Sequence, residues 1–598
     1  MNKKLSAINY LLSATCSHGR ACPPRRVPPC KTAIQQKRLD TARRLQRLIC
    51  VVFLAALGTA TAQTLAPVRK LPLNEALETS KNMPPAPPRK IETSPRMISP
   101  FGVFTSFQAN VDASGNNILG DAANEPAIAV DPTDPNKMVI GWRQFDSINS
   151  DFRQGGWGYT TDAGVHWTFP GVLEPGVFRS DPVTHSDEIG TFFYLSLMQD
   201  FCDDVWNSTN GGQSWTQGGP GHGGDKEWFT IDVTNGPGHG FQYQFWSGVF
   251  PCNSGEFSRS TDAGLTWMTP INVPNDTDTG ALDVDTNGNL FVGGSDFSGQ
   301  FRCLRSSNAQ NGGQTPTFDQ NTLVNLDGFL IQGGINGIGL CGQTFIVIDH
   351  SGTATNNNIY MLASVVPNGQ STTEVMFARS TDGGLSFSAP IRINDDGSHQ
   401  NKWHWFGTLS VAPNGRIDVV WYDTRNAANN IDSQLFYSYS TDAGVTWAPN
   451  VAVSDSFNPQ SGFPGGNNKI GDYITIVSGN TGGNVAYAAT FNVNPNAVGG
   501  HEQDVYYVRV FPTGGSSPTP TPTASPTPTA TATATPTATA TPTATPTATA
   551  TATVTATPTA TATATSTATS SPSATPRATP TPRFQPTPRP RPTPAPRP

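Results

Sequence analysis

Carboxylates, arginines and aromatic rings flank several short alternating strands of this sequence, and together they could act on a sugar. Glu227 and Asp423 could supply the proton donor and the nucleophile or base that glycoside hydrolysis needs. Arg143 and Arg425 could hold an anionic group through paired hydrogen bonds. The other residues predicted to contact a ligand are Asp146, Asp225, Asp296, Trp403, His404 and Trp405. Each has a structural alternative, because an aspartate beside a strand is commonly a turn residue and an Arg–Asp pair can tie neighbouring sheets together.

A turn motif that recurs along the chain indicates which elements position these residues. It appears as YTTDAGVHW (159–167), NSTNGGQSW (207–215), RSTDAGLTW (259–267), RSTDGGLSF (379–387) and YSYSTDAGVTW (437–447), with a worn copy at 305–318. Its acidic or amide positions, 46 to 74 residues apart, are Asp162, Asn210, Asp262, Asn308, Asp382 and Asp442. This spacing suits one small antiparallel sheet per repeat, the size of a propeller blade.

The residue types of the motif are those of a tight turn. Asp or Asn can accept hydrogen bonds from the backbone ahead of it, the glycine permits a positive φ, and the closing Trp or Phe offers a large apolar face. The motif resembles the Asp-box of the sialidase-like (BNR-repeat) β-propellers, over residues 124–511. The resemblance implies an all-β propeller of four-stranded antiparallel blades, with the boxes as scaffold.

The number of blades follows from the pairs of alternating strands. Seven such pairs can be counted, and a strand from residues 100–111 would complete the seventh blade and close the ring. We therefore predict seven blades; six, the usual number in sialidases, is the alternative.

Such a meander places the residues before each inner strand, and after each second strand, on the face opposite the boxes. The residues expected there are Asn124, Glu125, Arg143, Asp146, Asp181, Asp225, Lys226, Glu227, Asp296, Lys402, Trp403, His404, Trp405, Asp423, Arg425, Lys469 and Asp472. The sequence therefore predicts a ligand site on that face, near the axis.

Sialidases hold the substrate carboxylate with three arginines, the first of them in a Phe/Tyr-Arg-Ile-Pro motif near the start of the propeller. That motif is absent here, and GWRQFD (141–146) stands in a comparable place without matching it. The resemblance thus carries the fold but not the catalytic residues. Two functions remain open: binding of an extracellular glycan or glycoprotein, and exo-acting glycoside hydrolysis of the sialidase type or a related one.

No cofactor and no metal are expected from the sequence. The nine histidines are scattered, and no His/Cys spacing typical of a metal site occurs. The segment DVDTNGN (283–289) begins like a calcium loop, but the twelfth position is Gly294 instead of Glu, so we interpret it as a hairpin turn.

Composition divides the chain into four parts. Residues 1–62 form a basic leader whose segment 43–62 has the charged, apolar and Ala-Thr-Ala regions of a secretory signal. Residues 63–99 are predicted to be a disordered linker, 100–511 the propeller, and 512–598 a disordered tail rich in Thr, Pro and Ala. The protein is thus predicted to be secreted or displayed at the cell surface.

Charge and length bear on the partners. The whole chain carries a net charge of −7, which leaves −22 for residues 63–511 once the basic leader and tail are removed, and this argues against nucleic acid as a partner. We expect a monomer without a transmembrane helix after signal cleavage.

Four of the eight cysteines, Cys202, Cys252, Cys303 and Cys341, lie after the predicted cleavage site. Cys202 and Cys252 both follow the second strand of consecutive blades, so we predict a disulfide between them. If the other pair also forms a bridge, it joins Cys303 to Cys341.

Overall fold

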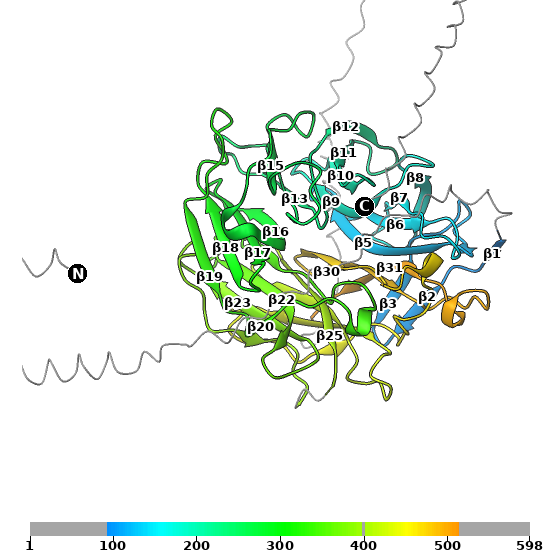
Figure 1. Ribbon diagram of the computed structural model, residues 1–598. Coiled ribbons are helices and arrows are strands. Elements are labelled where there is room, and N and C mark those ends of the chain that lie inside the picture. Colours follow the sequence, from blue (N-terminus) through cyan, green and yellow to red (C-terminus); the bar gives the residue numbers. More distant parts are fainter. Residues whose placement is uncertain (1–91, 398–400, 513–598) are drawn as a thin grey trace, which may run out of the picture. The chain divides into compact units, whose positions relative to one another are not determined.

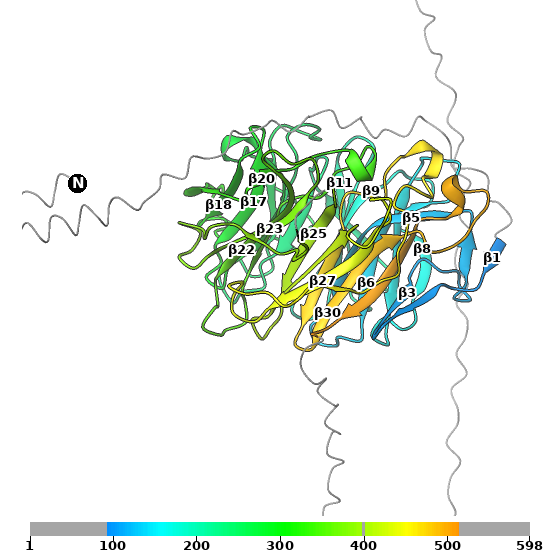
Figure 2. The same cartoon turned by 90° about the horizontal axis from the view of Figure 1, so that it is seen from below.

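The computed structural model describes residues 92–397 and 401–512, and seven small antiparallel sheets surround a central axis in this part of the chain (Figures 1 and 2). The prediction of a seven-bladed, all-β propeller is confirmed. The predicted signal, most of the predicted linker and nearly all of the predicted tail lie outside the described residues. Among the described helices, none is long and apolar enough to cross a membrane.

Blades 1 to 7 are numbered by their inner strands. In this order the inner strands are β5 (Ala122–Val130), β9 (Ser180–Ser186), β13 (Trp228–Ile231), β16 (Thr277–Val284), β21 (Phe345–Ile348), β25 (His404–Val411) and β29 (Thr475–Gly479). The second strands are β6 (Met138–Phe145), β10 (Phe192–Leu197), β14 (Gln242–Phe245), β17 (Leu290–Asp296), β22 (Ile359–Pro367), β26 (Ile417–Asp423) and β30 (Gly482–Ala489). The third strands are β7 (Gln154–Thr160), β11 (Asp203–Ser208), β15 (Phe257–Ser260), β18 (Phe301–Ser306), β23 (Glu374–Ser380), β27 (Gln434–Ser440) and β31 (Asp504–Val510).

The outer positions are less regular. Blades 1, 2, 4, 5 and 6 end in β8 (Thr168–Val172), β12 (Thr216–Pro220), β19 (Gln320–Val324), β24 (Ile391–Arg392) and β28 (Val451–Ala452). Blade 3 is a three-stranded sheet whose fourth position is reduced to a single bridge between Phe257 and Ile271. In blade 5 the short β20 (Gly328–Phe329) also pairs with β22.

The two ends of the described chain close the ring. β3 (Phe104–Gln108) pairs with β31 as the outer strand of blade 7, and β2 (Ile98–Phe101) pairs with β3. The predicted closing strand from residues 100–111 is therefore confirmed. β1 (Glu92–Ser94) pairs with β4 (Asn117–Leu119), so strands already begin within the range 63–99 that was predicted to be a linker.

The repeated turns connect the third strand of a blade to its outer part, as predicted. In blade 6, Asp442 Oδ1 accepts hydrogen bonds from Ser440 Oγ (2.8 Å) and the Thr446 backbone N–H (2.9 Å), and Oδ2 accepts from Thr446 Oγ1 (2.6 Å). Asp162, Asn210, Asp262 and Asp382 accept equivalent bonds. The closing ring packs on the preceding blade, with Trp447 5.1 Å from Phe377 between centroids.

The last glycine of each turn is required for a reason beyond backbone freedom. Both Ala443 and Gly444 have a positive φ, yet the first of these positions is Ala in three copies and Gly in two, whereas the second is always Gly. A Cβ on Gly444 would lie 2.4 Å from the Phe377 ring of blade 5, while a Cβ on Gly383, at the first position, would meet nothing within 4 Å. The conserved element of the motif within this chain therefore marks the closest approach between adjacent blades.

This contact generates a matched pair of substitutions. We expect Gly383→Ala to lower the free energy of unfolding by about 1 kcal/mol, the cost of an alanine at positive φ. Gly444→Ala should cost roughly 1–3 kcal/mol more, because its methyl group must displace the Phe377 ring. Urea unfolding of the two variants measures the difference. Equal losses would show that the close approach to blade 5 does not determine the choice of glycine.

The cysteines behave differently from one another. Cys202 and Cys252 form a disulfide that joins the loops after β10 and β14, with their Cα atoms 4.7 Å apart, so the predicted bridge is confirmed. The conditional second bridge is absent from the described residues: Cys303 and Cys341 are free, buried, and belong to separate apolar clusters. They lie in β18 and in the connection before β21, which ring packing keeps apart.

A non-reducing peptide map of the denatured, alkylated protein tests this assignment. We expect one linked peptide pair containing Cys202 and Cys252, with the alkyl label on Cys303 and Cys341. Reduction of the bridge should destabilise the protein by about 4 kcal/mol, since it closes a 50-residue loop in the unfolded chain. A peptide joining Cys202 to Cys303 or Cys341 would contradict the structure.

Candidate functional site

A left-handed residue recurs near the start of the inner strands, on the face opposite the repeated turns. It is Glu125 (φ 53°) in blade 1, Asp181 (42°) in blade 2, Lys226 (59°) in blade 3, Thr279 (47°) in blade 4 and Phe406 (56°) in blade 6. In blades 1, 4 and 6 the pairing with the second strand shifts register at this residue, as at a β-bulge. A positive φ is unfavourable for residues other than glycine, so the backbone is strained at these positions. A bulge changes the direction of the side chains around it, which is the structural effect of this strain.

Three charged residues from two non-adjacent blades meet at the axis. Asp472, which precedes β29 of blade 7, accepts hydrogen bonds on Oδ2 from Lys469 Nζ and from Lys226 Nζ of blade 3, both at 2.6 Å. All three side chains are buried. The two ammonium groups hold the pKa of Asp472 well below its usual range, although burial alone would raise it. Removing one member would leave an uncompensated buried charge.

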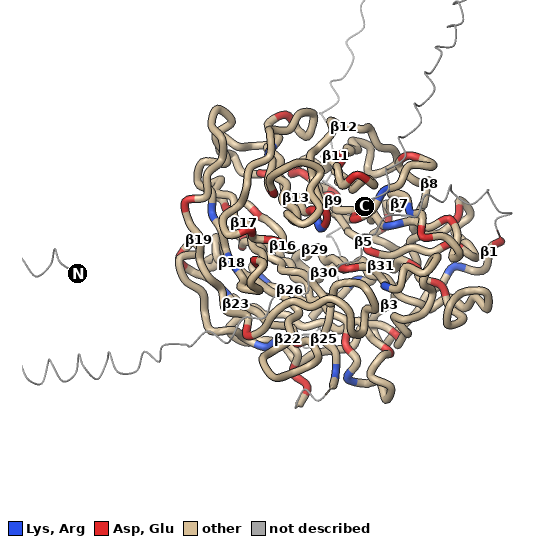
Figure 3. The backbone as a smooth tube through the Cα atoms, in the orientation of Figure 1, with Lys and Arg blue, Asp and Glu red and all other residues tan. Residues whose placement is uncertain are grey.

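The same network continues into blade 1. Lys469 Nζ lies 3.6 Å from Glu125 Oε1, and Arg143 Nε lies 3.0 Å from Glu125 Oε2 and 2.8 Å from Asn124 Oδ1. Burial raises the pKa of Glu125 to about 8, against the opposing influence of Arg143 and Lys469. Arg143 is thus an ion-pair partner of a neighbouring carboxylate, in agreement with the structural alternative for this residue. Basic and acidic positions lie close together beside the labels of β9 and β13 in Figure 3.

Glu227, one of the two predicted catalytic carboxylates, lies beside this network at the start of blade 3. Its side chain is buried, and neither oxygen accepts a hydrogen bond from another of the described residues. Burial, and then the negative charges of Asp203 and Asp181, raise the pKa of Glu227 well above its ordinary value. A raised pKa shifts this carboxyl group towards its protonated form, which is the form that a general acid needs.

A glycine-rich connection covers part of the network. Asn336, in the short helix η2 (Gly334–Asn336), donates to the Gly471 carbonyl (2.7 Å), and the Leu340 N–H donates to Asp472 Oδ1 (2.8 Å). The Ile338 N–H also donates to the Asn468 carbonyl (3.1 Å). The connection between β20 and β21 is thereby pinned to the 468–472 segment and shields the axial charges on this side.

Asp423, the second predicted catalytic carboxylate, lies in blade 6 with its own partners. Its Oδ2 accepts from Trp421 Nε1 and Arg425 Nε, both at 2.8 Å, and lies 3.7 Å from His404 Nε2. Arg425 also donates to Asp395 Oδ1 (2.7 Å) and lies over the Phe436 ring. Glu227 begins blade 3 and has Asp203, Asp181 and Asp225 as its charged neighbours, whereas Asp423 contacts His404 and Arg425 of blade 6. Among the described residues, no contact joins Glu227 to Asp423.

The predicted aromatic platform is not available as such. Trp405 is fully buried among Phe406 and Tyr422, which leaves no face of its ring open to a sugar. Trp403 is partly buried and packs against the same apolar cluster. Both rings belong to the apolar core between blades 6 and 7. An alternating strand pattern does not distinguish an aromatic side chain in the core from one at a ligand site.

Two further predicted ligand residues occupy turns. Asp296 accepts from the backbone N–H groups of Ser298 and Gln300 and from Arg302 Nε (2.7 Å), and these bonds hold its pKa below the ordinary value despite burial. Asp146 is exposed and accepts from Gln154 Nε2 (2.7 Å). The segment 283–289 forms the β16–β17 hairpin turn, as predicted.

A small pocket of about 20 Å³ opens beside the network, between blades 2 and 3. Asp225 and Asp181 lie at it together with Arg153 and three phenylalanines. The rings of Phe201 and Phe250 stack 5.3 Å apart, next to the Cys202–Cys252 bridge, and Arg153 lies 4.6 Å from the centroid of Phe178. Of the predicted ligand residues, Asp225 is the one that lines this pocket.

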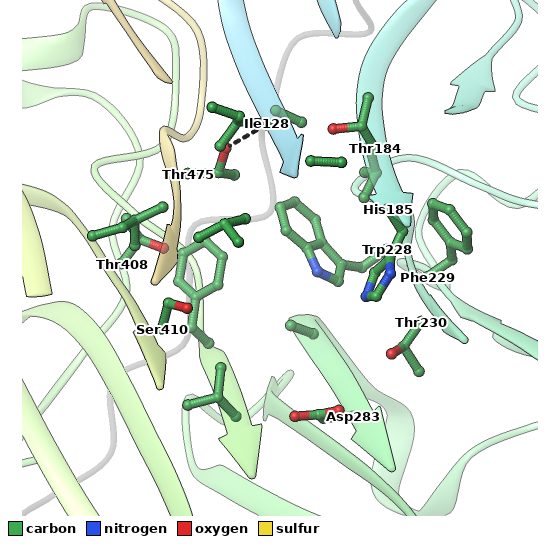
Figure 4. Close-up of a pocket in the computed structure, with 18 of the residues that line it drawn as sticks. Ile128, Thr184, His185, Trp228, Phe229, Thr230, Asp283, Thr408, Ser410 and Thr475 are labelled. Carbon is green, nitrogen blue, oxygen red and sulfur yellow. Dashed lines mark hydrogen bonds between the residues drawn. The ribbon is translucent and has the colours of Figure 1, made fainter. Parts of the chain in front are cut away.

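A larger cavity, with a volume of about 250 Å³, lies in the axial channel (Figure 4). All seven inner strands line it, including residues 228–230 of β13 and 475–477 of β29. Trp228 stands in it, with its ring centroid 5.3 Å from that of Tyr473 and 5.4 Å from that of Phe345. Its lining is mainly apolar, so size alone does not make it the better site for a sugar.

Three charged residues on this face were not predicted from the sequence. Asp203 begins β11, Glu374 begins β23, and Asp396 follows β24. The first two start third strands, whose connections from the second strands run on the same face. Extending the search from the ends of second strands to the starts of third strands would have found both.

Comparison with known proteins gives similarity in fold at low identity. No protein-family model matches the chain, and no curated protein matches it. Similar solved structures include a protein of unknown function from Dyadobacter fermentans, with 13% identity over 68% of this chain and 98% of that chain and a TM-score of 0.38. The phage phi92 endosialidase is similar with 10% identity over 69% of this chain and 70% of that chain and a TM-score of 0.39. Trypanosoma rangeli sialidase is also similar, with 12% identity over 69% of this chain and 59% of that chain and a TM-score of 0.33.

The buried carboxyl of Glu227 predicts a pH-dependent effect on stability. A carboxyl whose pKa is raised on folding contributes stability that is fully present below its unfolded-state pKa and is lost as pH rises through the folded value. Glu227→Gln replaces it with an uncharged group of similar shape. The difference in melting temperature, variant minus wild type, should therefore increase as pH rises from 4.5 to 8.5.

Glu92→Gln, at an exposed glutamate, provides the control and should follow the wild type across this range. Parallel melting curves for wild type and Glu227→Gln at every pH would show that Glu227 is not held protonated by the fold.

Proposed function

We propose that this protein is an extracellular glycan-binding propeller whose site lies on the face opposite the repeated turns, at the pocket beside Asp181 and Asp225. The observation that carries the proposal is the composition of that pocket, which combines one arginine, two carboxylates and three aromatic rings. Sugars are bound in this way, by stacking of their C–H faces on a ring and by hydrogen bonds from their hydroxyl groups to charged side chains.

The pocket is small, and the proposed ligand lies across its mouth. Phe201 and Phe250 are partly exposed and form one wall, while Asp225 lies 3.4 Å from Lys226 Nζ at the edge of the axial network. A terminal sugar or a short branch of a glycoprotein glycan would then contact the rings and the carboxylates from outside. The predicted signal segment and the disulfide are compatible with a protein that works outside the cell.

The alternative is an exo-acting glycoside hydrolase, sialidase or related. What favours it is Glu227, whose raised pKa suits a general acid. What weighs against it is the engagement of Arg143 and Arg425 in ion pairs with neighbouring carboxylates, together with the lack of a contact between Glu227 and Asp423 among the described residues. The binding function is therefore the one that the geometry supports better.

A glycan array and a panel of aryl glycosides, including aryl sialosides, distinguish the two functions. We expect binding of at least one glycan and no hydrolysis of it. Phe250→Ala should weaken that binding about tenfold, the loss of one aromatic stacking contact. Leu385→Ser, at an exposed leucine of a repeated turn, is the matched control and should bind as the wild type does.

Hydrolysis that disappears in Glu227→Gln would replace the binding function with the enzymatic one. Binding that is unchanged in Phe250→Ala but lost in Leu385→Ser would contradict the proposed position, because the site would then lie on the face of the repeated turns.

A further inference from the structure

A buried histidine of blade 6 faces a set of carboxylates that the proposed function does not use. His404 begins β25 and is fully buried. Its Nε2 lies 3.2 Å from Asp396 Oδ1 and 3.7 Å from Asp423 Oδ2, and its Nδ1 lies 3.4 Å from Glu374 Oε2. A carboxylate oxygen of Glu374, a carboxylate oxygen of Asp396 and a ring nitrogen of His404 all lie within 4.8 Å of one another.

The backbone fixes which ring nitrogen carries the proton in the neutral imidazole. Nδ1 of His404 lies 3.0 Å from the carbonyl oxygen of Thr373, an acceptor only, so Nδ1–H donates to it. Nε2 is then left with its lone pair, and it has no hydrogen-bond partner among the described residues. A lone pair directed at carboxylate oxygens is repulsive unless a positive charge lies between them, and that charge is either a proton or a metal ion.

The carboxylates are held in place independently of His404. Asn394 Nδ2 donates to Asp396 Oδ1 (2.9 Å) and also to Glu374 Oε2. Trp421 and Arg425 hold Asp423, as described above. A histidine whose second nitrogen donates to a backbone carbonyl, beside carboxylates that are themselves hydrogen-bonded, is the arrangement that outer-shell groups give to metal ligands.

The charges beside His404 favour a positive charge at Nε2. Carboxylate oxygens of Glu374, Asp396 and Asp423 lie within 3.7 Å of the ring nitrogens, and Arg392 and Arg425 contact these carboxylates. The two arginines do not neutralise the three carboxylates, so a proton or a metal ion at Nε2 would be stabilised there.

We propose that His404 Nε2, Asp396 and Glu374, with Asp423 at the edge of the site, bind one divalent cation. A donor set of one imidazole nitrogen and several carboxylate oxygens suits ions of the Mn²⁺ and Zn²⁺ type better than Ca²⁺ or Mg²⁺, which prefer oxygen alone. Glu374 and Asp396 come from blade 5 and its exit, and His404 from blade 6. The ion would thus tie two neighbouring blades together at the face that carries the proposed glycan site, without depending on that function.

Metal binding to the full chain, produced without a histidine tag and stripped with a chelator, tests the proposal. We expect one Mn²⁺ or Zn²⁺ per chain by calorimetry and elemental analysis, and a higher melting temperature with the ion than with chelator. Asp396→Asn should weaken binding at least tenfold. Asp395→Asn, at the exposed neighbouring carboxylate that bonds Arg425 and does not contact His404, is the matched control and should bind as the wild type does.

His404→Gln provides a second variant at the nitrogen ligand, and it should lose binding while its melting temperature no longer responds to the ion. The proposal is overturned if the wild type binds no Mn²⁺ or Zn²⁺ and nuclear magnetic resonance shows His404 as a protonated imidazolium. It is equally overturned if Asp396→Asn binds as tightly as the wild type, or if Ca²⁺ or Mg²⁺ binds more tightly than Mn²⁺ and Zn²⁺.

Discussion

The closure of the ring by β3 and β31 is the constraint on which the other features of this propeller depend. The pairing joins residues about 400 positions apart and gives blade 7 its outer strands. Polar side chains reinforce it: Asp504 accepts from Asn110 Nδ2 (2.7 Å), and Tyr487 Oη donates to Ser106 Oγ (2.6 Å), all in buried positions. Without this pairing, β31 would expose unpaired backbone groups, and blade 7 would lose its fixed position against blade 1.

Once the ring is closed, the two faces are stabilised by different kinds of interaction. On the face of the repeated turns, each Asp or Asn bonds groups within four residues of itself, and each glycine fits against the preceding blade. On the opposite face the bonds cross the axis, as between Lys226 and Asp472, which are 246 residues apart. The first kind tolerates variation between blades, while the second exists only when non-adjacent blades are held at the correct distance.

The charged network therefore has two consequences for function. Near the starts of the inner strands, Glu125, Asp181 and Lys226 have a positive φ, and the ion pairs of Lys226 with Asp181 and of Lys469 with Glu125 keep the buried charges tolerable. The Trp228 ring, which stands in the axial cavity, packs against Tyr473, the residue that follows Asp472 of the network. The two proposed sites, at the pocket between blades 2 and 3 and at the carboxylates around His404, lie on this same face.

The sequence by itself determined the class of fold, the number of blades, the strand that closes the ring and the Cys202–Cys252 bridge. These are properties of period, alternation and turn chemistry, which are local and repeat in every blade. It also placed Glu125, Asp181, Lys226, Glu227, Lys469 and Asp472 on one face, because strand ends alternate between faces in a meander.

Only the tertiary structure decided which of those groups meet. It paired Arg143 with Glu125 and Arg425 with Asp423, gave Glu227 and Asp423 different neighbours, and buried Trp405, which the strand pattern left open to a sugar. It also assembled His404 with Glu374 and Asp396 from two blades, where the sequence predicted no metal. The physical reason is that blade curvature and strand bulges determine which side chains meet across the axis. The repeat period and the alternation of apolar and polar residues contain no information on those distances.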